Sequence, residues 1–259
     1  MKTIRTIAEL REALGDARDV GLVPTMGAFH EGHLSLIRAA RAESQTVVVS
    51  LFVNPAQFAE AADLDGYPRD EQRDAELAEP AGVDVLFAPS VEELYPPGFQ
   101  TWVEVEELSR GLEGEFRPCH FRGVATVCLK LFKNVRPSRA YFGQKDAQQA
   151  AILRRMVADL NLDIELRVLP TVRDADGLAL SSRNVLLSPE DRARGLTLPR
   201  ALHAGAGADD PVATALAALD GLDVDYVAVA DFDPPVLAGA VRVGSTRLID
   251  NVPLEGAKR

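Results

Sequence analysis

The stretch VGLVPTMGAFHEGHLSLIRAA, residues 20–40, decides the fold, because an apolar segment there gives way to an amphipathic one. Residues 20–23 predict a β-strand, and the apolar spacing over residues 34–42 predicts an α-helix. A glycine-containing turn with two histidines, His30 and His33, joins the two segments. A strand that leads through a short turn into a helix predicts one unit of a parallel α/β sheet.

The same alternation continues outward from this stretch. The β-branched run TVVVSLFVN, residues 46–54, predicts a strand that is buried on both faces. We expect further strands at residues 83–89, 140–143 and 164–172, and an edge strand or hairpin piece at 101–105. Helices are expected at residues 68–79, 123–135 and 146–160, the last with Asp146 as its N-cap. This pattern predicts an α/β fold with a Rossmann-like, doubly wound parallel sheet.

The character of the chain changes after residues 171–176. Residues 188–205 and 209–221 predict short helices, and residues 224–233 and 241–254 predict two final strands. We therefore expect two domains: a Rossmann-like domain over residues 1–175 and a smaller C-terminal α/β domain over residues 176–259.

Composition limits the classes of function. No apolar run approaches the ~20 residues that span a bilayer, and the charged N-terminus lacks a signal core, so a cytoplasmic protein is expected. A net charge of -11 argues against a broad nucleic-acid-binding face but permits small anionic substrates. Cys119 and Cys128 are too few for a disulfide framework and are expected to be reduced, buried thiols.

The histidine pair of the opening stretch admits three interpretations. The two imidazoles could pack or face solvent, or they could bind zinc, for which the chain offers only His120 and His203 as further histidines. The third interpretation uses position, because a strand-to-helix turn directs free backbone N–H groups and the helix dipole at a bound anion. Two imidazoles on such a turn can donate hydrogen bonds to phosphate oxygens.

The motif H-x-G-H after a first strand resembles the signature of the nucleotidyltransferase superfamily. The longer string VPTMGAFHEGHLSLIRAA, residues 23–40, is similar to the pantothenate synthetase (pantoate–β-alanine ligase) family. The resemblance continues through SLFVNPAQF, DLDGYPRD, CHFRGVATVCLKLF, RAYFGQKDAQQ, LSSRN and TRLIDN and covers nearly the whole chain. It implies a ligase in which ATP activates pantoate as pantoyl adenylate with release of pyrophosphate. β-Alanine then attacks the acyl carbon and gives pantothenate and AMP.

The resemblance also implies roles for individual residues. His30, His33, Lys145 and Arg183 are the expected catalytic residues, with phosphate stabilisation favoured over proton donation by His33, because pyrophosphate leaves as an anion. The domain of residues 1–175 is expected to bind nucleotide and pantoate, and residues 176–259 to form a lid. The residues expected to bind ATP are Met26, Gly27, His30, His33, Gly143, Gln144, Lys145, Asp146, Val172, Leu180, Ser181, Ser182 and Arg183.

Glutamines suit the hydroxyls of pantoate, because a carboxamide donates and accepts hydrogen bonds at once. Gln57 and Gln149 match the pantoate-binding glutamines of the family, and Asn54 is expected to order the loop of Gln57. Pro24 is expected either to line the pocket beside the methyl groups of pantoate or to pack in the core. The resemblance also implies that the protein forms a homodimer.

Magnesium is expected to bridge the triphosphate, with Asp74 as a candidate ligand, although Arg73 and Asp70 depart from the family pattern. Cys119 stands where the family has glycine in RPGHFRG. His120 and Arg122 match that motif; they are expected either to line the anionic pocket or only to order that loop, and we leave them outside the catalytic set.

Two other functions compete with this assignment. Another H-x-G-H nucleotidyltransferase would transfer the nucleotidyl group to a phosphorylated acceptor and release no AMP, but it should lack the paired glutamines. A non-catalytic nucleotide sensor would be favoured by loss of a histidine, of Lys145 or of Arg183, and all of these are present.

Overall fold

The structure is a computed structural model that describes residues 1–254. The chain forms two compact units. Unit 1 comprises Met1–Gly143 and Ile152–Leu169, and unit 2 comprises Gln144–Ala151 and Pro170–Arg259. The change of unit at Pro170 precedes the expected boundary at residue 176, and residues 144–151, expected in the N-terminal domain, group with unit 2.

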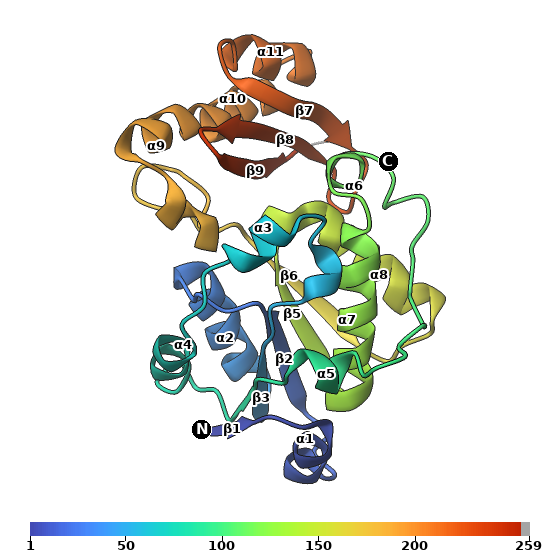
Figure 1. Ribbon diagram of the computed structural model, residues 1–259. Coiled ribbons are helices and arrows are strands. Elements are labelled where there is room, and N and C mark those ends of the chain that lie inside the picture. The colour runs from blue at the N-terminus through green and yellow to red at the C-terminus, as the bar shows by residue number, and fades with distance from the viewer. Residues whose placement is uncertain (255–259) are drawn as a thin grey trace. The chain divides into compact units, whose positions relative to one another are not determined.

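Unit 1 is built on a parallel sheet that has six strands within the described residues (Figure 1). The strand order is β1-β4-β3-β2-β5-β6, and every neighbouring pair is parallel. The strands are β1 (Lys2–Ile4), β2 (Val20–Thr25), β3 (Thr46–Leu51), β4 (Val85–Phe87), β5 (Arg139–Gly143) and β6 (Glu165–Leu169). This architecture confirms the predicted Rossmann-like parallel sheet.

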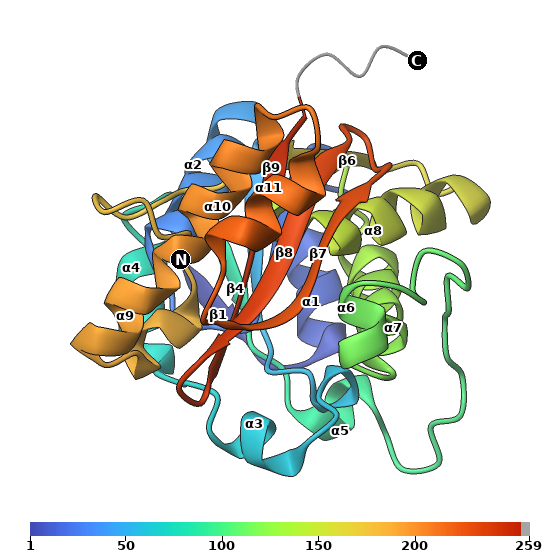
Figure 2. The same cartoon turned by 90° about the horizontal axis from the view of Figure 1, so that it is seen from above.

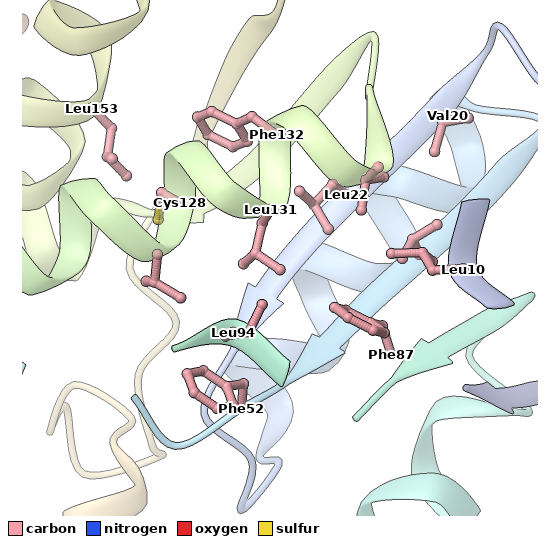
Figure 3. Close-up of a cluster of buried hydrophobic side chains, with 14 of the residues drawn as sticks. Leu10, Val20, Leu22, Phe52, Phe87, Leu94, Cys128, Leu131, Phe132 and Leu153 are labelled. Carbon is pink, nitrogen blue, oxygen red and sulfur yellow. The ribbon is translucent and has the colours of Figure 1, made fainter. Parts of the chain in front are cut away.

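Helices cover both faces of this sheet, because successive strand residues point to opposite sides. One face, with Leu22 and Phe87, packs against α1, α7 and the later part of α8, and Figure 3 shows this core around Leu131 and Phe132. The other face, with Val23 and Val49, packs against α2 and α4. The helices that begin within unit 1 are α1 (Ile7–Leu14), α2 (Glu31–Glu43), α3 (Ala61–Asp65), α4 (Glu71–Ala78), α5 (Val91–Leu94), α6 (Glu113–Phe116) and α7 (His120–Val135).

The strand order reverses between β2 and β5. From β2 the chain moves outward through β3 and β4, whereas β5 and β6 lie on the other side of β2. Ligands of such sheets bind beyond the carboxyl ends of the strands at this switch point. The residues that follow β2 and β5 along the chain are those of the H-x-G-H turn and of the GQKD segment.

Unit 2 contains the antiparallel sheet β7-β8-β9, in which β7 is Asp223–Ala230, β8 is Val236–Val243 and β9 is Thr246–Pro253 (Figure 2). Leu198 and Leu202 of α10 (Thr197–Ala206) pack with Leu237 and Val241 of β8 in one core. The helices α9 (Pro189–Gly195) and α11 (Pro211–Ala218) complete the helical layer, and α8 (Ala147–Asp159) begins in unit 2 and continues in unit 1. Among the described residues, no helix has the length and apolar character that crossing a membrane requires.

Three local predictions are wrong. Residues 101–105 form no strand; the backbone N–H of Val103 donates instead to the Thr126 hydroxyl on α7, 3.0 Å away. The expected strand at 241–254 is interrupted at Gly244, whose φ of 58° allows a tight turn between β8 and β9. Cys119 is exposed rather than buried, whereas Cys128 is buried, and both thiols are free.

Candidate active site

The turn after β2 is held by a buried carboxylate from α4. Gly27 and Ala28 both have positive φ, 91° and 52°, so the chain reverses sharply between β2 and α2. Asp74 accepts hydrogen bonds from the N–H groups of Ala28 (2.8 Å) and Phe29 (2.6 Å). Gly27 must lack a side chain, because a Cβ there would lie 2.7 Å from Leu51 and 2.9 Å from the Asp74 carboxylate.

The two histidines cap the helix that follows the turn. His30 is the N-cap of α2, and its Nδ1 accepts from the N–H of Gly32 at 3.1 Å. His33, three residues later, accepts at its own Nδ1 from the N–H of His30 at 3.4 Å. The ring centroids are 4.1 Å apart. The H-x-G-H spacing therefore forms a reciprocal capping box in which imidazoles take the usual places of Ser and Glu.

This capping corrects one expectation from the sequence. The turn was expected to offer free backbone N–H groups to an anion, but those of Ala28, Phe29, His30 and Gly32 donate to side chains of the protein. Since each imidazole accepts at Nδ1, the neutral form of each ring carries its hydrogen on Nε2. The imidazole N–H groups, supported by the dipole of α2, are hydrogen-bond donors that this motif can direct at an anion.

The loop after β3 fixes the direction of the Gln57 carboxamide. Asn54 caps the short 3-10 helix η1 (Pro55–Gln57), and its Nδ2 donates to the Gly123 carbonyl (3.1 Å) and to Oε1 of Gln57 (3.0 Å). Because Oε1 is engaged by Asn54, the Gln57 amide presents its NH2 group on the other side, where it contacts the Met26 sulfur at 3.1 Å. Gln57 is thus arranged as a hydrogen-bond donor.

A cavity of about 260 Å³ opens at the carboxyl ends of β2, β3 and β4. Met26 and Gly27 line it from the H-x-G-H turn, Asp74 from α4, and Phe52 and Ser90 from the ends of the neighbouring strands. The expected pocket residue Pro24 is half-buried near the end of β2, next to this region. The predicted unit 1 residues Met26, Gly27, Asn54 and Gln57 therefore lie around the same strand ends.

Asp74 is almost fully buried, and burial raises the pKa of its carboxyl above the ordinary value of 3.8. The hydrogen bonds from Phe29 and Ala28 and the charge of Arg73 offset only part of this rise, and Asp70 adds to it. Within residues 1–254 no group of three or more His, Cys, Asp or Glu side chains could hold a metal ion. Each carboxylate oxygen of Asp74 keeps a second lone pair, so its role as a magnesium ligand stays a prediction.

In unit 2, Asn251 of β9 holds the backbone of the GQKD segment. Its Nδ2 donates to the carbonyls of Gln144 and Lys145, both at 2.9 Å, and its Oδ1 accepts from the Gln144 side chain at 3.3 Å. Lys145 and Asp146 belong to the 3-10 helix η2 (Gln144–Asp146), directly before α8. Gly143 is the last residue of β5, and Gln149, half-buried, lies in the first turn of α8.

The remaining predicted residues of unit 2 lie in one hairpin-like segment. The Leu180 N–H donates to the Val172 carbonyl at 3.0 Å, and Ser181 caps the 3-10 helix η3 (Ser182–Leu186) by accepting from the N–H of Arg183. Ser182 is buried and Arg183 is half-buried. At the base of this segment Arg173 donates two hydrogen bonds, 2.7 and 3.0 Å, to the buried Asp250 carboxylate.

Two of the residues that hold these segments were missed as supports from the sequence: Asp74 was considered only as a metal ligand, and Asn251 had no assigned role. His120, whose Nδ1 lies 3.0 Å from the Gln57 carbonyl oxygen, was expected to line the anionic pocket or only to order its own loop, and its contact with Gln57 was not predicted. The motifs CHFRG and TRLIDN contain His120 and Asn251, and DLDGYPRD ends four residues before Asp74. The backbone partners of Asp74, His120 and Asn251 lie 45, 63 and 107 residues away along the chain.

Known proteins are similar to this chain in sequence and in fold. Residues 2–253 match the family described as pantoate-beta-alanine ligase. A pantothenate synthetase from Moorella thermoacetica is 52% identical over 98% of this chain and 99% of its own length. The crystal structure of pantothenate synthetase from Thermus thermophilus has a TM-score of 0.94 at 47% identity and covers 98% of this chain and 99% of that chain.

A crystal structure of pantoate-beta-alanine ligase from Francisella tularensis, complexed with beta-gamma ATP and beta-alanine, has a TM-score of 0.87 at 34% identity. It covers 99% of this chain and 99% of that chain. The fold and the capped histidine turn define an α/β protein with an H-x-G-H motif at the switch point of a parallel sheet. The chain belongs to the pantoate–β-alanine ligase family. Its activity is the ATP-dependent condensation of pantoate with β-alanine.

Proposed function

We propose that the condensation proceeds through pantoyl adenylate. A carboxylate oxygen of pantoate attacks the α-phosphorus of ATP, and the bond from that phosphorus to pyrophosphate breaks. The amine of β-alanine then attacks the acyl carbon and loses a proton, and the bond from the acyl carbon to the bridging oxygen breaks. AMP leaves with one oxygen that came from pantoate. The observation that carries this proposal is the capped H-x-G-H turn, whose donors are suited to phosphate oxygens.

Electrostatic stabilisation and positioning provide the catalysis in this scheme. His30 and His33 donate from Nε2 to phosphate oxygens, and Lys145 and Arg183 supply positive charge as pyrophosphate departs. Asp146 binds the ribose hydroxyls. The other ATP-binding residues that we propose are Met26, Gly27, Gly143, Gln144, Val172, Leu180, Ser181 and Ser182.

Pantoate is bound by the two glutamines. Gln57 donates through the amide NH2 that Asn54 directs, and a hydroxyl oxygen of pantoate would replace the weak thioether acceptor of Met26. Gln149 binds pantoate from the start of α8, and Pro24 contacts its apolar body. The buried position of Gln57 supports this role, since a buried amide donor selects strongly for an acceptor.

Mg²⁺ is the proposed cofactor. It would neutralise charge on the triphosphate oxygens, and it usually keeps several waters, so few protein ligands are needed. Asp74 is the candidate ligand from this chain, although both of its oxygens already accept backbone hydrogen bonds. We further propose that the protein works as a cytoplasmic homodimer, as an inference from the family.

Transfer of an isotopic label tests the adenylate. Pantoate carrying ¹⁸O in its carboxylate should place one ¹⁸O in AMP when ATP, Mg²⁺ and β-alanine are supplied. With pantoate and ATP alone, one equivalent of pyrophosphate per active enzyme should form. Formation of ADP, with the label in inorganic phosphate, would instead indicate an acyl phosphate and contradict the proposal.

A further inference from the structure

The first turn of α7 is hydrogen-bonded to the loop that contains Asn54 and Gln57. His120, buried at the start of α7, lies with its Nδ1 3.0 Å from the Gln57 carbonyl oxygen. The carbonyl of Gly123, one turn later, accepts from Asn54, which in turn holds the Gln57 side chain. Both the main chain and the side chain of Gln57 are therefore tied to this turn.

The hydrogen bonds determine the tautomer of His120. The Gln57 carbonyl can only accept, so the Nδ1 of His120 carries the hydrogen. The other ring nitrogen, Nε2, lies 3.2 Å from Nη1 of Arg117, which can only donate, so Nε2 accepts. These two contacts use both nitrogens of a neutral imidazole, and they fix the ring plane as well as its donor.

Close packing reinforces this arrangement at Gly123. A Cβ at that position would lie 2.4 Å from the Ala56 carbonyl oxygen and 2.7 Å from the Gln57 nitrogen. These are backbone atoms, so any side chain at residue 123 would displace η1 rather than another side chain. Gly123 allows the helix and the loop to approach within hydrogen-bonding distance.

We propose that His120 is a positioning residue for the hydroxy-acid substrate, acting through Gln57. Its Nδ1 donates to the Gln57 carbonyl and holds the main chain of Gln57 in place, so that the side-chain NH2 group stays within hydrogen-bonding reach of the substrate oxygen. Arg117, whose guanidinium lies 3.9 Å from the buried Glu113 carboxylate, orients the imidazole from the other side. This inference rests on the proposed binding of pantoate by Gln57.

Two substitutions at residue 120 separate positioning from simple packing. His120→Leu removes the donor at similar size, and we expect it to raise the KM for pantoate about tenfold while the KM for ATP changes less than about twofold. In His120→Asn, the amide nitrogen can take the place of Nδ1, and we expect the KM for pantoate to stay within about threefold of wild type. A role in folding alone would lower thermal stability and leave the KM of the folded enzyme unchanged.

Glycine variants supply an independent test and its control. Gly123→Ala should raise the KM for pantoate by a similar factor, because it displaces η1, whereas Gly111→Ala should change neither KM, since a Cβ there meets no atom within 4 Å. If His120→Leu does not fold, His120→Asn is compared with His120→Gln, which moves the amide away from the Nδ1 position. The Asn variant should then bind pantoate more tightly.

Gln57→Ala separates the role of Gln57 in binding pantoate from the role of His120 in positioning Gln57. If Gln57→Ala raises the KM for pantoate while His120→Leu, or the Asn and Gln pair, leaves it unchanged, the role of His120 is overturned and that of Gln57 stands. If Gln57→Ala itself has no effect on the KM for pantoate, the proposed role of Gln57 fails, and the inference about His120 fails with it.

Discussion

The turn after β2 in unit 1 and the GQKD segment in unit 2 are held by contacts of opposite polarity. In the turn, the Asp74 carboxylate accepts from the N–H groups of Ala28 and Phe29. In the GQKD segment, the Asn251 amide donates to the carbonyls of Gln144 and Lys145. One support is a buried acid that engages backbone donors, and the other is a neutral amide that engages backbone acceptors.

The difference matters for the phosphate binding that we propose for each segment. In the turn, the main-chain N–H groups of residues 28–30 and 32 donate to side chains of the protein, so the imidazoles are the donors that we propose for phosphate. In the GQKD segment, the support adds no charge beside Lys145, so the ammonium is not neutralised by the residue that holds its backbone. A buried carboxylate in that place would weaken a phosphate-binding lysine.

The largest expected effect comes from converting the neutral support into a charged one. Asn251→Asp removes both donors and brings a carboxylate against two carbonyls, so we expect kcat/KM for ATP to fall about 100-fold and the free energy of unfolding to fall by about 2–4 kcal/mol. If Asn251 acts through Lys145, the same change in a Lys145→Ala background should lower kcat/KM by less than about threefold. Steady-state kinetics and denaturant unfolding measure both quantities.

Asn134→Asp is the matched control for this experiment. Asn134 is also buried, and its amide also donates to a backbone carbonyl, that of Lys130 at 2.8 Å, but it lies in unit 1 at the end of α7. It should alter stability without changing the KM for ATP. Fully additive losses in the Asn251→Asp, Lys145→Ala double variant would show that Asn251 does not act through the lysine.

An intermediate effect is expected when the charged support is made neutral. Asp74→Asn directs an NH2 group at one of two N–H donors, and we expect a loss of about 2 kcal/mol in the free energy of unfolding near pH 4. Because burial raises the folded-state pKa of Asp74, the unfolded chain loses this proton first as pH rises above about 3.8. The stability advantage of the wild type over Asp74→Asn should therefore shrink as pH rises through the raised pKa.

Denaturant unfolding of the wild type and of Asp74→Asn between pH 3.5 and 7 gives the difference between their free energies of unfolding at each pH. The other titrating groups are the same in both proteins, so their contributions largely cancel. An advantage that grows with pH would mean that the two backbone N–H groups and Arg73 stabilise the carboxylate more than burial destabilises it. The view that burial, on balance, destabilises the charged form of Asp74 would then be wrong.

The smallest effect is expected at Cys119, the residue before His120. Cys119 has a φ of 65°, in the left-handed region that glycine adopts without strain. Cys119→Gly should raise the free energy of unfolding by about 1 kcal/mol and leave both KM values unchanged, since the Cys119 side chain is exposed. Thermal unfolding with and without a reductant checks this, and a loss of stability would show that the thiol makes a contact worth more than the backbone strain.

Local patterns in the sequence predicted the alternating strands and helices of unit 1, because buried parallel strands are uniformly apolar and helices show their own period. Val48 and Val49 of β3 and Leu36 and Ile37 of α2 are examples. The strand β1 and helix α1 were not predicted, although Thr6 and Glu9 form a capping box that gives a local signal. The residues 101–105 alternate like a strand, but Thr126 provides the N–H partner that a neighbouring strand would have supplied.

The candidate site was predicted as a set of motifs and not as a set of contacts. The H-x-G-H pair, Gln57, Lys145 and Arg183 could be selected because each follows a predicted strand or matches a family motif. The supports could not, since Asp74, His120 and Asn251 reach backbone atoms between 45 and 107 residues away. No local periodicity encodes which buried side chain will meet which peptide group.

The direction of the Gln57 carboxamide has a consequence for inhibitor chemistry. Because Asn54 donates to its oxygen, this glutamine directs its NH2 hydrogens at a bound acid, so it discriminates by polarity more than by shape. An analogue with an ether oxygen opposite the amide preserves the match. A protonated amine in the same place sets donor against donor and should be excluded, even though it differs from the natural acid by a single heavy atom.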